Sequence, residues 1–171
     1  QKDIGKYKVD ILKRRIKLIN KNVRVKILRE KASEKNLNKI VKNYDIIVDG
    51  TDNFKSKFLI NKFALKYKKK LIVGAISKFD GHIFSFDFSK KSSPCLKCFY
   101  QTEPSDEVLN CESEGILGTT SNVIGSLQAN EVIKNIVTIK NNLHSSILIM
   151  DLKKLNFRKI EFTKKRGCLC N

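Results

Sequence analysis

The sequence predicts one α/β domain whose sheet begins parallel and ends antiparallel. The first half alternates helix-type and strand-type apolar segments, which is typical of parallel α/β units. After residue 75 the pattern changes to short strands in direct succession, which indicates antiparallel pairing. The chain has 171 residues, of which 41% are hydrophobic, enough for one core. We therefore expect a single domain over residues 1–171.

The first half is predicted to contain helices and parallel strands in turn. Val9, Leu12, Ile16 and Ile19 recur at helical spacing and predict an amphipathic helix over residues 6–19. Residues 23–27 alternate apolar with basic side chains, which predicts a short strand, and a brief helix follows over 37–41. Residues 46–48 are consecutive and β-branched, as in a strand covered on both faces. A helix over 54–66 and a strand over 71–75 complete this part.

The second half is predicted to close the sheet with antiparallel strands. Asp80-Gly81 is a tight-turn signal, and the alternation over 82–88 predicts a hairpin in which His82 is a strand residue rather than a ligand. Residues 89–114 form a long polar loop, a helix runs to about Val137, and strands follow over 146–150 and 155–162. The helix is expected to have an apolar face made of Ala129, Val132, Ile133, Ile136 and Val137. Near its start, small residues would allow another backbone to approach closely: Gly118, Ser121 and Gly125.

The strong positive charge is interpreted as solvated helix surface. The formal net charge is +18, and lysine supplies most of it in a chain also rich in isoleucine and asparagine. Such a compositional bias makes nucleic acid an unlikely partner, although an acidic protein partner remains compatible with it. The sequence contains no apolar signal segment and no run long enough to span a bilayer, so we expect a cytoplasmic protein without membrane contact.

Polar residues follow the central strand directly. Asp52 and Asn53 come after Gly50, at the carboxyl end where ligands gather in open α/β sheets. An aspartate there can hold a metal ion that carries phosphates. It can also cap the helix that starts at residue 54, and the two roles are compatible. Lys8, at the basic start of the first helix, is either a phosphate contact or a solvated surface residue.

The five cysteines favour metal binding over a disulfide framework. Cys95 and Cys98 have C-x-x-C spacing, and Cys168 and Cys170 form a second pair, so four thiolates are available for a tetrahedral zinc site. A redox C-x-x-C is the alternative, but it usually opens a helix after a strand, whereas this pair follows Pro94 in a loop. Cys111 remains unpaired and is either a nucleophile or an ordinary free thiol.

Taken together, the order of these segments resembles the ThiF/MoeB/HesA family, relatives of the ubiquitin-activating enzymes. The resemblance runs from Asp3 to Cys170 and includes Lys8 in I-G-K-Y-K-V, Asp52 in D-G-T-D-N, the C-x-x-C pair, Cys111, and residues 124–129 with the sequence I-G-S-L-Q-A. It implies a Rossmann-like adenylation fold with a mixed sheet, acting as a homodimer. It also implies use of ATP and Mg²⁺ to adenylate the C-terminal glycine of a ubiquitin-like sulfur carrier protein ending in Gly-Gly.

The resemblance assigns roles to residues of this chain. It implies Lys8 as a phosphate contact, Asp52 as the magnesium and phosphate residue with Asn53 beside it, and Cys111 as the cysteine of persulfide or thioester chemistry, with a sulfurtransferase as a possible sulfur donor. It implies Zn²⁺ held by Cys95, Cys98, Cys168 and Cys170. Adenylation brings a carboxylate against a phosphate, so cations are needed to offset the repulsion between two anions.

Two departures from the family pattern bear on these expectations. The family's glycine-rich loop, its ribose-holding acidic residue and a catalytic arginine all lie upstream of the position matching Gln1, so the chain resembles the C-terminal two thirds of such a domain and is expected to be inactive alone. The terminal pair is C-x-C rather than the C-x-x-C of the family, so the resemblance leaves zinc ligation by Cys170 open.

Two functions and two carriers therefore stay open at this point. The alternative to an adenylating enzyme is a noncatalytic zinc-bearing α/β binding module or an inactive fragment. The carrier is of the thiamine or the molybdopterin type. The short stretch between Cys98 and Cys111, with Glu103-Pro104, favours the thiamine type.

Overall fold

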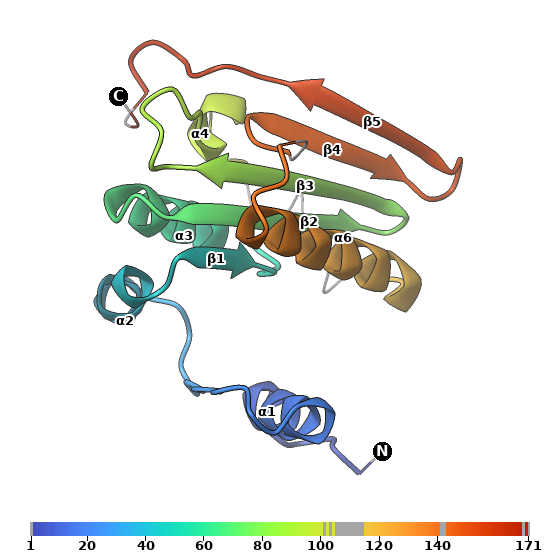
Figure 1. Cartoon of the computed structure of the whole chain (residues 1–171). Coiled ribbons are helices and arrows are strands. Elements are labelled where there is room, and N and C mark those ends of the chain that lie inside the picture. Colours follow the sequence, from blue (N-terminus) through green and yellow to red (C-terminus); the bar gives the residue numbers. More distant parts are fainter. Residues whose placement is uncertain are drawn as a thin grey trace. The chain divides into compact units, whose positions relative to one another are not determined.

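The computed structural model describes residues 2–100, 102, 104, 115–140, 143–168 and 170. The chain forms two compact units, Gln1–Ala32 and Ser33–Asn171, and each is described by itself (Figure 1). The expectation of one domain over the whole chain stays a prediction.

The smaller unit is organised around helix α1 (Lys8–Ile19), none of whose side chains is buried. Ion pairs hold the segments before and after the helix against it: Asp3 contacts Arg14 at 2.8 Å, and Asp10 contacts Arg29 at 3.0 Å. The strand predicted over residues 23–27 is wrong, because the described residues of this unit contain no strand. Alternating side chains are not sufficient for a strand, since its backbone N–H and C=O groups need a neighbouring strand to bond with.

In the described part of the chain, the larger unit is built on a five-stranded sheet in the order β1-β2-β3-β4-β5. The strands are β1 (Ile46–Asp49), β2 (Lys70–Ser77), β3 (Asp80–Asp87), β4 (Ser146–Asp151) and β5 (Asn156–Glu161). Strands β1 and β2 are parallel, and all other neighbours are antiparallel, which confirms the predicted mixed sheet. Val48 is 51% exposed, so the expected coverage of β1 on both faces is wrong there. Among the described residues, β1 lies at the edge of the sheet.

Helices lie on both faces of the sheet (Figure 1). Helix α3 (Phe54–Lys66) connects the parallel strands β1 and β2, and α6 (Gly118–Ile136) packs against β2 and β3. Ile72 and Ile83 meet Ile124 of α6 on one face. On the other face Phe84 and Phe54 of α3 both contact the ring of Tyr100, which follows the short helix α4 (Leu96–Phe99). Helix α2 (Glu34–Ile40) and the 3₁₀ helix η1 (Val41–Asn43) precede β1.

The hairpin between β2 and β3 turns two residues earlier than predicted. Ser77 pairs with Asp80, so the turn residues are Lys78 and Phe79, and Asp80-Gly81 belongs to β3. Gly81 serves packing instead of the turn, because a Cβ atom there would stand 2.5 Å from Cδ1 of Ile124. His82 lies half-buried in β3, as expected for a strand residue.

Helix α6 turns a largely polar stripe toward the sheet. Its buried residues are Thr120, Ile124, Gln128, Glu131 and Asn135. Of the expected apolar face, Val132 packs against the core, whereas Ile133, Ile136 and Val137 lie on the outside and are between 54% and 66% exposed. The buried Glu131 is accommodated because Lys134 contacts it at 2.8 Å and the backbone N–H of Leu143 donates to it at 2.9 Å.

The expected close approach at the start of α6 is absent from the described residues. A Cβ atom at Gly118 or Gly125 would meet nothing within 4 Å. Close packing occurs instead where α6 lies over β2 and β3, at Gly74 and Gly81.

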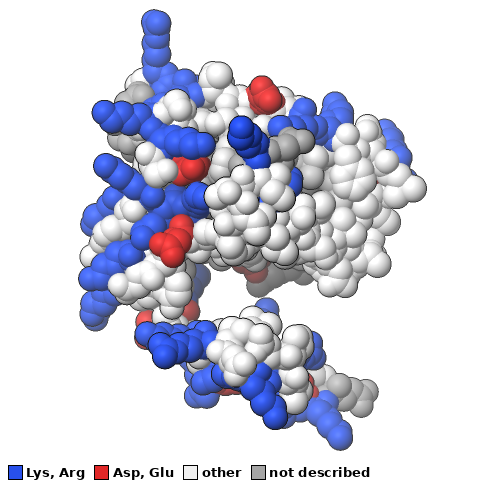
Figure 2. Space-filling view, viewed as in Figure 1, with Lys and Arg blue, Asp and Glu red and all other residues white. Residues whose placement is uncertain are grey.

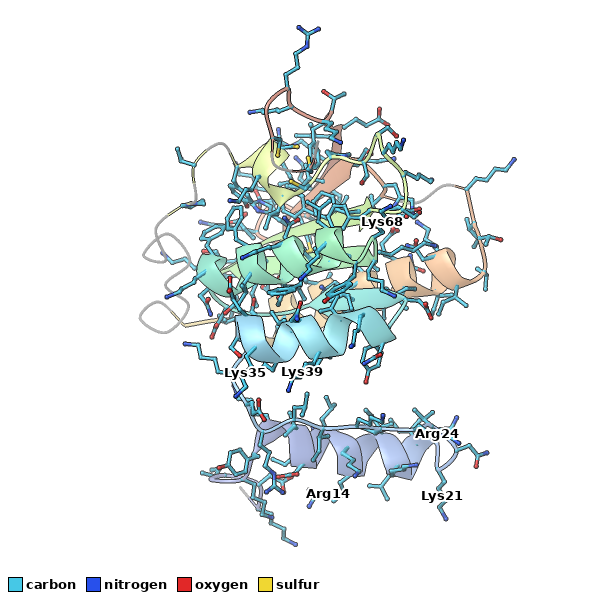
Figure 3. The ribbon with its side chains drawn as sticks, turned by 90° about the vertical axis from the view of Figure 1, so that its left-hand side faces the viewer. Arg14, Lys21, Arg24, Lys35, Lys39 and Lys68 are labelled. Atoms are coloured by element: carbon cyan, nitrogen blue, oxygen red, sulfur yellow. The ribbon has the colours of Figure 1, made fainter. Side chains whose placement is uncertain are left out.

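Lysine side chains gather on the part of the larger unit formed by α2 and α3 (Figure 2). Lys35 and Lys39 extend from α2, and both are exposed (Figure 3). This agrees with the interpretation of the basic charge as solvated helix surface. Among the described residues, no helix has the length and apolarity that crossing a membrane requires.

Substituting Gly81 tests the packing of α6 on the sheet. In the 171-residue chain, Gly81→Ala should lower the free energy of unfolding by about 1–3 kcal/mol, because the added methyl group collides with the buried Ile124. The control Gly125→Ala should leave stability unchanged or raise it by up to about 1 kcal/mol, since its methyl group has open space in a helix. Equilibrium urea unfolding measures both, and equal effects of the two substitutions would contradict this packing.

Candidate functional site

The T-D-N turn lies at the carboxyl end of β1, as predicted. Asn53 is the N-cap of α3, and its Oδ1 accepts a hydrogen bond from the backbone N–H of Ser56 at 2.8 Å. The alternative that Asp52 caps this helix is therefore wrong. The Asp52 side chain is exposed, and its Oδ1 accepts from Nδ2 of Asn53 at 2.9 Å. An exposed carboxylate that is not used as a helix cap, at this edge of the sheet, fits a magnesium ligand.

A buried polar network lies beneath this turn, and sequence reasoning missed it. Asp49 and Lys57 form an ion pair at 3.3 Å with side chains 0% and 2% exposed. Gln128 of α6 donates from Nε2 to the backbone oxygen of Asp49 at 2.9 Å. The spacing in the sequence was a signal, because Lys57 precedes Ile60, Asn61 and Ala64 by three, four and seven residues and so shares one face of the helix with them. The structure buries that face.

Lys8 is an exposed residue at the first position of α1. It belongs to the smaller unit, whereas Asp52 and Asn53 belong to the larger one. The phosphate contact expected of Lys8 therefore stays a prediction.

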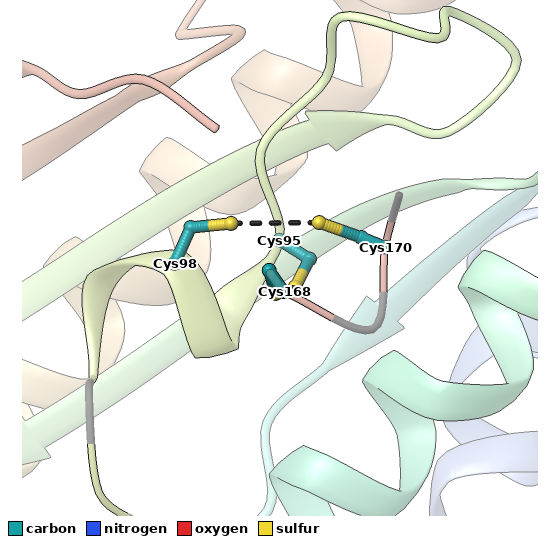
Figure 4. Close-up of side chains that lie close together, drawn as sticks. All are labelled: Cys95, Cys98, Cys168 and Cys170. Atoms are coloured by element: carbon teal, nitrogen blue, oxygen red, sulfur yellow. Dashed lines mark hydrogen bonds between the residues drawn. The ribbon is translucent and has the colours of Figure 1, made fainter. Parts of the chain in front are cut away.

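The structure brings four of the predicted metal ligands together (Figure 4). The sulfur atoms of Cys95, Cys98, Cys168 and Cys170 all lie within 4.8 Å of one another. Sγ of Cys95 is 3.6 Å from that of Cys168, and Sγ of Cys98 is 3.5 Å from that of Cys170. These separations are too long for disulfides, whose sulfurs are about 2 Å apart. The short C-x-C spacing thus does not keep Cys170 out of the cluster.

The cluster fits a tetrahedral zinc ion. Four sulfurs at about 2.3 Å from one ion are separated from each other by about 3.8 Å, close to the observed distances. The local chain supports this arrangement, because the buried Asn61 of α3 accepts from the backbone N–H of Leu96, next to Cys95, at 3.1 Å. The backbone N–H of Lys165 points to the sulfur of Cys98 at 3.5 Å.

The thiols of the cluster differ in acidity. Burial raises the pKa of Cys95 to about 11, and electrostatic repulsion between Cys95 and Cys98 adds to the rise. Burial also raises the pKa of Cys170, together with hydrogen bonds to Cys168 and Cys98. At Cys168 burial acts in the same direction, but hydrogen bonds from Cys170 and its other neighbours outweigh it and lower the pKa. Zinc must therefore displace at least the protons of Cys95 and Cys170.

Two other features complete the description of the site. Cys111 lies outside the described residues, so its predicted role is not placed. A groove of about 630 Å³ runs beside α3, with Phe58, Leu59 and Leu65 among its lining residues. Neither Asp52 nor Asn53 lines this groove, so it is separate from the predicted nucleotide site.

Solved structures share the fold of this chain. The crystal structure of E. coli MccB with ATP has a TM-score of 0.80 at 18% identity, and the match covers 99% of this chain and 52% of that one. The Microcin C7 biosynthetic enzyme MccB in complex with N-formylated MccA gives a TM-score of 0.78 at 18% identity, over 100% of this chain and 54% of that one. The chain therefore has the mixed α/β fold of MccB.

Sequence comparison then gives the family. The model of the ThiF family matches residues 1–171, and the chain belongs to this family. This confirms the resemblance inferred from the T-D-N and G-S-L-Q-A segments.

Curated relatives are named for adenylation. The chain is 38% identical over 166 residues to the probable molybdopterin-synthase adenylyltransferase of Gracilaria tenuistipitata var. liui, covering 97% of this chain and 46% of the relative. It is 31% identical over 170 residues to the sulfur carrier protein adenylyltransferase of Thermus thermophilus, covering 97% and 63%. It is also 32% identical to the adenylyltransferase and sulfurtransferase MOCS3 of Culex quinquefasciatus, covering 97% and 38%. The chain thus spans between 38% and 63% of the lengths of these relatives.

Zinc binding should strengthen as the pH rises. The pKa of Cys95 is about 11, so its thiol is protonated throughout the range from pH 6 to pH 8 and loses its proton when zinc binds. The pKa of Cys170 is raised as well, so its proton is also displaced. Each displaced proton makes the affinity rise about tenfold per pH unit, so two protons should raise the apparent affinity about ten-thousandfold over this range. Competition against a chelator, corrected for the chelator's own titration, measures the change. A pH-independent affinity would exclude ligation by Cys95.

Proposed function

We propose that the protein adenylates the C-terminal glycine of a ubiquitin-like sulfur carrier protein with ATP. The observation that carries the proposal is the Asp52 carboxylate, which stands exposed at the carboxyl end of β1 while Asn53 caps the following helix. Membership of the ThiF family and the names of the relatives support this class of reaction. Because the chain spans only part of those relatives, the activity is proposed for the longer chain that includes the family's upstream glycine-rich segment.

The residues of this chain would divide the work at the reacting centre. Asp52 would hold a magnesium ion, with Asn53 fixing one of the carboxylate oxygens through its Nδ2. When bound, this ion offsets the repulsion between the carrier carboxylate and the α-phosphate and stabilises the charge that develops on the phosphate oxygens. Lys8 would add a positive charge toward the phosphates.

The four-cysteine cluster would hold zinc in a structural role. The buried Cys95 and Cys98 follow the hairpin strands, whereas Cys168 and Cys170 come from the C-terminal end of the chain. A closed site of four thiolates leaves no position open for a substrate, so the ion would tie these two segments together. Binding would then contribute directly to folding stability.

The partners follow from the same assignment. The carrier is of the molybdopterin or the thiamine type; two of the relatives are named for molybdopterin synthase and for a sulfur carrier. The exposed Ile133, Ile136 and Val137 of α6 support an apolar contact such as that of a homodimer. A sulfurtransferase is proposed as donor, because the relative from Culex combines the two activities in its name. Free thiols in the cluster are compatible with action in the cytoplasm.

A noncatalytic zinc-bearing binding module is the second candidate. The cysteine cluster favours it, since four thiolates can assemble without any nucleotide. Pyrophosphate exchange decides between the two: zinc bound at one ion per chain, with no ATP-dependent exchange by the longer chain in the presence of either type of carrier, would establish the module and exclude the enzyme.

Asp52→Asn should abolish most of the exchange activity. In the longer chain, loss of a magnesium ligand should lower ATP–pyrophosphate exchange by about 100-fold or more, which corresponds to roughly 3 kcal/mol of charge stabilisation. Asp45→Asn is the matched control, because Asp45 is an exposed carboxylate at the amino end of the same strand. Exchange by Asp52→Asn within a fewfold of the parent rate would remove Asp52 from the site.

Cys111→Ala should separate adenylation from the later transfer step. As a thiolate, Cys111 would attack the carbonyl carbon of the glycyl adenylate, form a thioester and release AMP. As a persulfide that has received its outer sulfur from the donor, it would attack the same carbon through that sulfur, release AMP and form an acyl disulfide. A thiol reductant would then cleave the S–S bond and release the carrier as a thiocarboxylate. The substitution should leave pyrophosphate exchange within about twofold and eliminate the carrier conjugate that a thiol reductant releases. Ser113→Ala is the control. Loss of exchange in Cys111→Ala would place the thiol in adenylation itself.

A further inference from the structure

An ion pair is buried directly beneath the T-D-N turn. Nζ of Lys57 lies 3.3 Å from Oδ2 of Asp49 and donates to the backbone oxygen of Gly74 at 2.6 Å. The side chains of Lys57 and Asp49 are buried, with exposed fractions of 2% and 0%. A buried pair of this kind contributes little net stability compared with a well-packed apolar pair of similar size. Its presence at this edge of the sheet therefore calls for a role other than stabilisation.

The second oxygen of Asp49 holds the turn. Oδ1 accepts from the backbone N–H of Thr51 at 2.8 Å and from the Thr51 hydroxyl at 2.7 Å. One carboxylate oxygen is thus bound to Lys57 and the other to Thr51. Because both oxygens are occupied, the carboxylate cannot rotate without breaking a buried contact.

Helix α6 fixes the same point from the other face of the sheet. Gln128 donates from Nε2 to the backbone oxygen of Asp49 at 2.9 Å. It reaches this position over Gly74, where a Cβ atom would stand 2.7 Å from the Gln128 side chain. The end of β1 is therefore held by its own helix α3 and by α6.

Hydrogen bonds link the residues on either side of Asp52 into a ring. Asp49 binds Thr51, Asp52 follows Thr51, and Asn53 donates to Asp52 at 2.9 Å. The backbone N–H of Lys57 donates to the backbone oxygen of Asn53 at 3.2 Å, and the Lys57 side chain returns to Asp49. Every residue of the turn between Asp49 and α3, except Gly50, is tied to the pair or to the helix cap.

We propose that the buried Asp49–Lys57 pair positions the Asp52 carboxylate for its cation and acts through the hydroxyl of Thr51. Asp49, Lys57 and Thr51 are positioning residues, since the proposal gives them no contact with substrate. It rests on the proposed function, which assigns a divalent cation to Asp52. Its distinctive consequence is that loosening the turn weakens cation binding and leaves carrier binding unchanged.

Thr51→Val is the most direct test. It removes the hydroxyl but keeps the size and branching of the side chain. Substituting Lys57 is less informative, because it leaves Asp49 charged and unpaired in the interior and threatens folding.

The chain offers a matched control in Ser89→Ala. Ser89 donates from its backbone N–H and its hydroxyl to Oδ1 of Asp87, at 3.2 Å and 2.6 Å, the same arrangement as at Thr51. Asp87 pairs with Lys70 at the amino end of β2, away from the carboxyl end of β1. Both substitutions remove one equivalent hydroxyl, so a general loss of stability would be common to both.

The experiment uses the longer chain with three measurements. For Thr51→Val we expect the dissociation constant for Mn²⁺, measured by electron paramagnetic resonance, to rise about five- to tenfold, together with the Mg²⁺ concentration for half-maximal pyrophosphate exchange. The KM for the carrier should not change. In metal-free protein, amide hydrogen exchange over residues 50–53 should quicken about five- to tenfold. Ser89→Ala should alter none of these values.

The outcomes separate this proposal from the proposed function. The positioning role would be overturned if Thr51→Val matched the parent protein in Mn²⁺ binding and in amide exchange over residues 50–53. It would also be overturned if Ser89→Ala showed the same changes as Thr51→Val. Faster amide exchange with unchanged Mn²⁺ affinity would also overturn it. If the parent protein shows no pyrophosphate exchange, the proposed function fails, whereas weaker Mn²⁺ binding confined to Thr51→Val would still support the positioning of Asp52.

Discussion

The buried ion pair of Asp49 and Lys57 is the interaction on which the candidate site depends. It connects the last residue of β1 to the first turns of α3, and through the backbone oxygen of Gly74 it reaches β2. Removing one partner of such a pair costs about 3–5 kcal/mol, because the other charge is left buried without compensation. The turn that carries Asp52 therefore depends on both partners of this ion pair. Asn53 ends the turn by capping helix α3.

The T-D-N turn and the cysteine cluster are built by different segments of the larger unit. The parallel pair β1 and β2 places the T-D-N turn at a carboxyl end, where α/β proteins bind ligands. The antiparallel strands lead to the short helix α4 and to the C-terminal segment, and their aromatic residues pack together through Phe84, Phe99 and Phe162. The four sulfurs gather where these two segments meet. One sheet thus supports a site open to solvent and a closed cluster suited to a structural ion.

Helix α6 shows why periodicity alone misassigned a face. Its apolar residues Ile133, Ile136 and Val137 make a convincing stripe, yet they are exposed. The opposite stripe is buried with specific partners for its two largest polar side chains: Gln128 bonds the end of β1, and Glu131 bonds Lys134 and the backbone of Leu143. Burial of a polar side chain is acceptable when its hydrogen bonds are made. A sequence pattern does not contain those partners.

The sequence by itself determined the mixed sheet and the family, and it named most of the residues that make up the candidate site. Strand alternation, the T-D-N and G-S-L-Q-A segments and the two cysteine pairs are local patterns, and local patterns can be read from one chain. Tertiary structure decided the rest. It brought Cys98 and Cys170 to 3.5 Å despite the short C-x-C spacing, and it gave the helix cap to Asn53 rather than Asp52. It left residues 23–27 without the neighbour that a strand needs, and it buried Lys57, because both outcomes depend on partners distant in sequence.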